Sequence, residues 1–169
     1  MRKLVGITIA LAAVMIGPAS AQGRIEGAAQ SEGLSLTTDP QVQVYRFSGV
    51  RDNGGAASVG VATSFHCTNF SGATETLRIQ IRAFNGTVIK DSTLNIPHNN
   101  NRTISTHFTN AYFEDLSLET GTIDQGSARI WATSTMIVCT ASTIDAAAIV
   151  PYGVDLHGIR FNPIPGTEY

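Results

Sequence analysis

Apolar and polar positions alternate with a period of two along most of the chain, and this pattern predicts β-strands. The clearest run, TLRIQIRAF at residues 76–84, sets leucine and isoleucine on one face and arginine and glutamine on the other. Similar runs predict strands over residues 41–47, 58–68, 76–84, 87–96, 102–108, 127–133, 136–143 and 150–161.

Turn residues separate these runs. Asn85-Gly86 lies between two alternating segments and predicts a hairpin with a type I′ turn. Residues 127–133 and 136–143 have the spacing of a second hairpin, and residues 110–118 predict a short helical turn. With many short strands and no long helix, we expect an all-β fold: a single antiparallel β-sandwich, for which an immunoglobulin-like architecture is one option.

The N-terminus has the three parts of a secretory signal peptide. Arg2 and Lys3 supply the positive charge, residues 4–16 are almost all apolar, and Ala19-Ser20-Ala21 supplies small residues for cleavage. An uncleaved membrane anchor is the alternative, but the apolar stretch is too short to cross a bilayer core of about 30 Å. We therefore expect export to the periplasm or the medium, with no stable membrane insertion after cleavage.

The rest of the chain divides by composition. A segment rich in Gly, Ala, Ser and Gln precedes the first strand, and Pro and Gly close the C-terminus. We expect a signal peptide at residues 1–21, a flexible lead-in at 22–40, one β-sandwich domain at 41–162 and an extended tail at 163–169.

The chain has two cysteines, Cys67 and Cys139. In an exported protein paired thiols oxidise, so we expect a disulfide that closes a loop of about 70 residues. Both cysteines lie on strand faces that carry apolar residues, which places the bridge inside the sandwich, plausibly between the two sheets. A free nucleophilic thiol or a pair of metal ligands is the rival interpretation, although no CxxC spacing supports it.

The net charge limits the classes of partner that we expect the protein to bind. The formal net charge is −2 and becomes more negative once Arg2 and Lys3 are removed. An acidic chain lacks the basic footprint that nucleic acid or an anionic membrane surface needs. We expect no nucleic-acid partner, and regard an envelope protein or a glycan as the partner classes left open.

No established catalytic or metal motif is present. The histidines His66, His98, His107 and His157 show no metal-ligand spacing, no serine lies in a G-x-S-x-G elbow, and we expect no cofactor. His66 and His107 both fall in predicted strands and are able to approach each other. A hydrolase built from His66, His157 and Asp155 remains an alternative if the fold brings these residues into one pocket.

Trp131 is the chain's only tryptophan. Trp131 lies on the opposite face of its predicted strand from Ala128, Ile130 and Ala132. If those three residues point into the core, Trp131 is exposed and available for binding. Tryptophan is well buried on average, which favours a core position. We retain His66, Trp131 and His157 as the candidate ligand-binding residues.

Three segments carry a resemblance: FHCTNFSG from Phe65, IVCTA from Ile137 and LHGIRFNPIPG from Leu156. Together they resemble a group of small exported bacterial proteins of unknown function, over most of the chain from about residue 42. The resemblance implies a periplasmic or secreted location and brings no activity or site residue with it.

The sequence therefore favours a non-enzymatic, exported binding or envelope-associated β-sandwich module. The hydrolase at His66, His157 and Asp155 is one alternative. A subunit of an envelope assembly, pairing through an exposed strand edge, is the other.

Overall fold

The structure is a computed structural model that describes residues 40, 42–54 and 57–161. This part of the chain forms β-strands joined by turns and loops, with no helix among the described residues. The strands are β1 (Val42–Asn53), β2 (Val61–Asn69), β3 (Glu75–Ala83), β4 (Val88–Ile96), β5 (Asn101–Ser105), β6 (Leu116–Ser117), β7 (Thr122–Ala132), β8 (Ile137–Asp145), β9 (Gly153–Asp155) and β10 (Gly158–Arg160).

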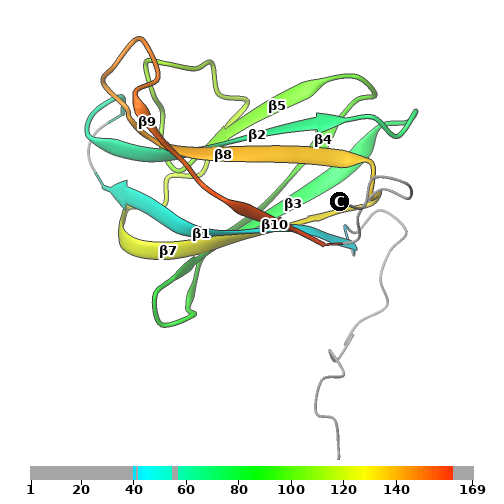
Figure 1. The fold of residues 1–169 in the computed structure, drawn as a ribbon, viewed down its shortest axis with the longest axis horizontal. Helices are drawn as coiled ribbons and strands as arrows, with labels where there is room; N and C mark the ends of the chain where they lie inside the picture. The colour runs from blue at the N-terminus through cyan, green and yellow to red at the C-terminus, as the bar shows by residue number, and fades with distance from the viewer. Residues whose placement is uncertain (1–39, 41, 55–56, 162–169) are drawn as a thin grey trace, which may run out of the picture. The chain divides into compact units, whose positions relative to one another are not determined.

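The strands form two five-stranded sheets that lie as two layers (Figure 1). Sheet A has the order β10-β1-β7-β3-β4, and sheet B has the order β6-β5-β2-β8-β9. Neighbouring strands are antiparallel, except that the two-residue β6 runs parallel to β5. The expected all-β sandwich with one disulfide is confirmed.

The core lies between the sheets and follows the predicted alternation. On β3, Leu77, Ile79 and Ile81 are fully buried, whereas the polar residues between them face away from the core. Phe47 of sheet A meets Phe65 of sheet B edge to face, with 5.7 Å between the ring centroids. Aromatic and branched side chains from both layers thus supply the apolar burial that holds the sheets together.

The disulfide joins Cys67 and Cys139 within one sheet, not between the two sheets as expected. Cys67 on β2 and Cys139 on β8 are direct register partners in sheet B, with 4.1 Å between their Cα atoms. Both side chains belong to the hydrophobic core. The bridge is inside the sandwich as predicted, but it cross-links neighbouring strands and so differs from the inter-sheet bridge of an immunoglobulin domain.

The hairpin at Asn85-Gly86 is confirmed, but its turn type is different. Gly86 has a φ of +85°, whereas Asn85 does not have the positive φ that a type I′ turn needs. Gly86 N donates to Ala83 O, and Ala83 N donates to Thr87 O. The connection is a longer loop, residues 84–86, that ends in a left-handed glycine. A register shift between Ile81 and Arg82 adds one residue to β4 just after this loop.

The predicted hairpin of residues 127–133 and 136–143 is wrong. β7 lies in sheet A between β1 and β3, while β8 lies in sheet B between β2 and β9. The short connection between them passes from one layer to the other. Each strand finds its hydrogen-bond partners among strands that are distant in sequence.

Five other segments also differ from expectation. Residues 110–118 form bends and the short β6 in place of a helical turn, and β5 ends at Ser105, before His107. The weak final strand at residues 150–161 is two strands, β9 in sheet B and β10 in sheet A. The first strand begins as predicted but continues to Asn53, and β2 begins only at Val61.

The sandwich covers most of the domain expected at residues 41–162. The predicted signal peptide (1–21), nearly all of the lead-in (22–40) and the tail (163–169) lie outside the described residues. Within the described residues no helix is long and apolar enough to span a membrane.

Candidate ligand-binding site

A cleft of about 500 Å³ opens where the chain leaves sheet B for sheet A. In Figure 1 this is the orange-to-red segment that passes from β9 in one layer to β10 in the other. The cleft is lined by Tyr45 and Phe47 of β1, His66 of β2, Tyr112, residues 139–142 of β8, and residues 155–158 between β9 and β10. Residues from both sheets therefore converge at this edge.

Two glycines allow the crossing chain to lie close to the sandwich. A Cβ atom on Gly158 would be 2.3 Å from Cε1 of Phe47, and one on Gly153 would be 2.2 Å from the carbonyl oxygen of Thr143. Only a residue without a side chain fits such approaches. The glycines that weaken the strand pattern in the sequence thus place Asp155 and His157 at the cleft.

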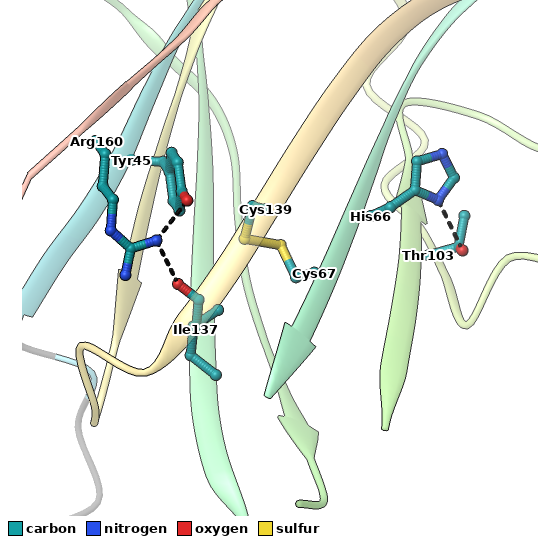
Figure 2. Close-up of a disulfide and its surroundings, with 7 residues drawn as sticks. All are labelled: Tyr45, His66, Cys67, Thr103, Ile137, Cys139 and Arg160. Carbon is teal, nitrogen blue, oxygen red and sulfur yellow. Dashed lines mark hydrogen bonds between the residues drawn. A yellow bond between two sulfur atoms is a disulfide. The ribbon is translucent and has the colours of Figure 1, made fainter. Parts of the chain in front are cut away.

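Arg160 fastens the crossing segment from its far end. Its guanidinium lies 5.1 Å from the centre of the Tyr45 ring and donates to the backbone oxygen of Ile137 at 3.0 Å (Figure 2). It also donates to the backbone oxygen of Thr135 at 2.7 Å. A residue of sheet A is therefore bonded to the start of β8 in sheet B. These hydrogen bonds hold sheet A and sheet B in a fixed position relative to each other.

His66 and Cys67 are adjacent on β2 but project to opposite faces, so that the disulfide lies on the core side and the imidazole on the outer side (Figure 2). His66 Nδ1 lies 3.1 Å from Thr103 Oγ1. The ring also meets Tyr112 edge to face at 4.4 Å between centroids. Both neighbours hold the imidazole in one orientation at the cleft.

The electrostatic environment of His66 favours the neutral ring. Burial lowers the pKa of His66, and the negative charge of Glu114 opposes this only in part. Its Nε2 atom is buried and has no hydrogen-bond partner in the described chain. A buried ring nitrogen without a partner costs about 1–3 kcal/mol of stability. The Nε atom of Arg160 is likewise buried without a hydrogen-bond partner in the described chain.

The cleft also presents polar groups that make no side-chain hydrogen bond within residues 40, 42–54 and 57–161. These are the Thr140 and Ser142 hydroxyls, the Asp155 carboxylate and the His157 ring. Ser142 and Asp155 are register partners across β8 and β9, so the hydroxyl and the carboxylate are neighbours. Such groups are available to a ligand.

The structure thus brings together three of the four residues singled out from the sequence: His66, His157 and Asp155 line one cleft. Trp131 is elsewhere. Ala128, Ile130 and Ala132 are fully buried, so Trp131 is half-buried on the outer face of sheet A and not in the core as expected. The Arg78 guanidinium covers its ring at 5.5 Å from the centroid.

Sequence reasoning did not foresee the roles of Tyr112 and Arg160 at the cleft. Tyr112 lies in the segment expected to be helical, and only the loop between β5 and β6 brings it against His66. Arg160 lies in the segment whose division between two sheets was not foreseen. No local pattern marks either residue, because each acts on partners that are distant in sequence.

His107 does not approach His66. It is buried after β5 and bonds instead to Asp52 and to the backbone of Val59. No group of three or more His, Cys, Asp or Glu side chains suited to a metal ion occurs in the described part of the chain. Neither cysteine is free, which removes the thiol nucleophile and the cysteine ligand pair.

Comparison with known proteins identifies no family model and no curated protein that matches the chain. A solved crystal structure, that of Thermotoga maritima 1070, is similar to it at a TM-score of 0.44 and 14% sequence identity. The similarity covers 75% of this chain and 97% of the Thermotoga maritima chain.

Proposed function

We propose that this protein is an exported, non-enzymatic binding module that takes a small polar ligand, a glycan fragment, in the cleft at the β9–β10 crossing. One observation carries the proposal. A single cleft gathers His66, Asp155, His157 and two hydroxyl groups, and none of these groups other than His66 is engaged in a side-chain hydrogen bond within the described chain.

The composition of the cleft suits a sugar. Its volume lies within the range of about 300–1,000 Å³ that is usual for small-molecule sites. Hydroxyl, carboxylate and imidazole groups match the hydroxyls of a glycan, while the half-buried ring of Tyr112 offers flat apolar surface for its C–H faces.

Export is part of the proposal. The Cys67–Cys139 disulfide is compatible with an oxidising compartment, where such bonds persist. The signal-peptide pattern at residues 1–21 supports the same location, in the periplasm or the medium. A glycan ligand is abundant there.

The geometry favours binding over catalysis. A hydrolase needs a nucleophile and a base within about 2.6–3.2 Å of each other. Among the described residues, Ser142, Asp155 and His157 make no such contact with one another or with His66. The close carboxylate–imidazole pair of the chain, Asp52 and His107, is buried and does not line the cleft.

The hydrolase remains the second candidate because His66, His157 and Asp155 share the cleft, with Ser142 beside Asp155. A hydrolase cleaves the glycan that it binds, whereas a binding module leaves it unchanged. Incubation with the glycans that bind, followed by mass spectrometry, separates the two functions: an unchanged glycan supports the binding module, and a cleaved one that depends on His157 establishes the hydrolase.

An envelope assembly has its own supporting observation. Ile149, Val150, Tyr152 and Val154 are all more than half exposed on β9 and the loop before it, at the edge of sheet B. Exposed apolar residues beside a strand edge are typical of protein contacts. A mass that rises with concentration in sedimentation would support this alternative, whereas a strict monomer would count against it.

The experiment for the proposed function is a thermal-shift screen of the purified oxidised protein against cell-wall and exopolysaccharide fragments. A ligand at 100 times its dissociation constant adds about 2.7 kcal/mol of stability. We expect His157→Ala and Ser142→Ala to abolish the shift. His98→Ala is the matched control, because His98 is exposed and bonds to Gly72 outside the cleft.

Two outcomes would contradict the proposal. One is a screen in which no glycan changes the melting temperature. The other is a shift that both cleft variants retain in full.

A further inference from the structure

The outer face of sheet A carries a block of four polar residues on two neighbouring strands. Arg46 of β1 lies directly opposite Arg129 of β7, and Ser48 lies directly opposite Ser127 in the same strand pair. Arg82 of β3 is opposite Ser127 on the far side of β7. Two rows, one of arginines and one of hydroxyls, therefore run side by side.

The positive charge in this block is not balanced by the described residues. Arg129 makes no hydrogen bond or ion pair with any of them. Arg46 contacts the amide oxygen of Gln43 and the ring of Phe161, and Arg82 donates to the oxygens of Gln80 and Gly86; all of these partners are uncharged.

Asp91 of β4 lies in the same cross-strand row as Arg129, but its carboxylate is already engaged. Asp91 accepts from Nε and Nη2 of Arg78 and from the side-chain amide of Gln80. This leaves Arg129 between two like charges. Its pKa is lowered by burial first and then by the charges of Arg82 and Arg46. Like charges directly opposite each other in a sheet are unfavourable, so the arrangement lacks a stabilising role in the fold alone.

The block also has the shape of a site. A hollow of about 300 Å³ is lined by Arg46, Ser48, Ser127, Arg129, His157 and Ile159. The two serine hydroxyls make no side-chain hydrogen bond within the described chain. Guanidinium forks and hydroxyl donors around one hollow are the groups that recognise the oxygens of a phosphate or carboxylate.

We propose that this hollow is an oxyanion-binding site, in which Arg46 and Arg129 balance the charge and Ser48 and Ser127 donate hydrogen bonds to a phosphate or carboxylate group. The proposal is independent of the glycan cleft. The two sites are connected, however, because His157 lines both hollows. The small size of the block and the acidic net charge of the chain fit a single anionic group and not a nucleic-acid backbone.

The test is a titration of the purified oxidised protein with inorganic phosphate at constant ionic strength, followed by tryptophan fluorescence. Trp131 is the only tryptophan and projects from the same face of β7 as Arg129. We expect a saturable change, and we expect Arg129→Gln to weaken the affinity by about tenfold, the loss of one charge-assisted contact.

The matched control is Arg51→Gln. Arg51 lies on the same strand as Arg46, is exposed and does not line the hollow, so this variant changes the net charge equally. We expect its phosphate affinity to equal that of the wild type. Ser127→Ala gives a second variant that keeps the charge, and we expect it to weaken binding without moving the melting temperature in phosphate-free buffer.

Phosphate also stabilises proteins generally by exclusion from their surfaces. A response of equal size in the wild type, Arg129→Gln and Ser127→Ala would show this general effect and overturn the site. A non-saturable response would do the same. A parallel titration with glucuronate identifies the source of the anion: tighter binding of glucuronate indicates a carboxylate ligand, and tighter binding of phosphate indicates a phosphorylated one.

Discussion

His107 bonds to Asp52 inside the sandwich, with 2.8 Å between Nδ1 of the ring and Oδ2 of the carboxylate. The other ring nitrogen lies 3.1 Å from the carbonyl oxygen of Val59. Both ring nitrogens are thus engaged, one with a side chain and the other with the backbone. The side chains are 4% and 1% exposed. The pair therefore links β1 to the loop after β5 through a bond shielded from water.

Replacement of His107 by alanine is expected to lower the free energy of unfolding by about 3 kcal/mol, because the buried Asp52 carboxylate loses one of its partners and keeps only Gly54 N and the Thr120 hydroxyl. Urea denaturation measures this. His98→Ala, at an exposed histidine, should cost no more than about 0.5 kcal/mol. Equal midpoints for the two variants would mean that the pair is not a stabilising element.

The lowered pKa of His66 predicts how stability depends on pH. In the folded state its pKa is below the ordinary histidine value of 6.5, so the unfolded chain binds a proton there first as the pH falls. The contribution of His66 is fully present above the unfolded pKa and is lost as the pH falls through about 6.5 toward the folded pKa. We expect His66→Gln to flatten the stability profile in this window, measured by urea denaturation between about pH 7 and pH 5. An identical slope in the variant would contradict this.

Removal of the disulfide has a predictable cost. Cys67 and Cys139 are separated by 72 residues, and the loop-closure model gives a stabilisation of about 4 kcal/mol as an upper value. We expect the double variant Cys67→Ala/Cys139→Ala to remain a β-sandwich by circular dichroism and to unfold at lower urea. Reduction of the wild type by dithiothreitol should reproduce the loss, and failure to do so would point to packing of the new alanines as its cause.

Gly158→Ala tests whether the close approach of the chain to Phe47 positions the cleft. The added Cβ would be 2.3 Å from the aromatic ring, so β10 or the ring must move. Overpacking of this kind costs about 1–3 kcal/mol. The neighbouring Ile159→Ala, at an exposed side chain, should change stability by no more than about 0.5 kcal/mol. A thermal melt compares the two, and a neutral Gly158→Ala would show that the crossing segment has room to shift.

Arg129→Gln is expected to leave the phosphate-free protein as stable as the wild type or more stable, by up to about 1 kcal/mol, because it removes a like-charge contact with Arg46. The gain should shrink as salt is added, since salt screens the repulsion. Urea denaturation at low and high salt checks both statements. A clear loss of stability would mean that the guanidinium packs favourably in a way that its contacts do not show.

Local patterns predicted much of this fold. The alternation around Ile79, the hairpin position at Asn85-Gly86 and the pairing of the two cysteines all depend on neighbouring residues or on the small number of cysteines. The gathering of His66 and His157 in one cleft was foreseen as an option.

The pairing of distant strands was not predictable in the same way. A short turn between residues 133 and 136 looks like a hairpin, and only the competition among all strands sends β7 and β8 to different sheets. Trp131 lies on the outer face because the alanines that alternate with it point into the core, and the Arg78 guanidinium covers its ring there. Arg46 faces Arg129 only because β1 and β7 pair in this register, although the two residues are 83 positions apart in the sequence.

The location of the disulfide within sheet B has a consequence for folding fidelity. β2 and β8 pair mostly through small or hydroxyl-bearing residues, such as Thr63 with Thr143 and Ser64 with Ser142, and several of them are buried on both faces of the sheet. A slip of one residue on β2 would turn His66 toward the core and Phe65 toward the outer face. The covalent bond between Cys67 and Cys139 excludes slipped alignments of β2 and β8. It thereby fixes which side chains, His66 among them, lie on the outer face of sheet B.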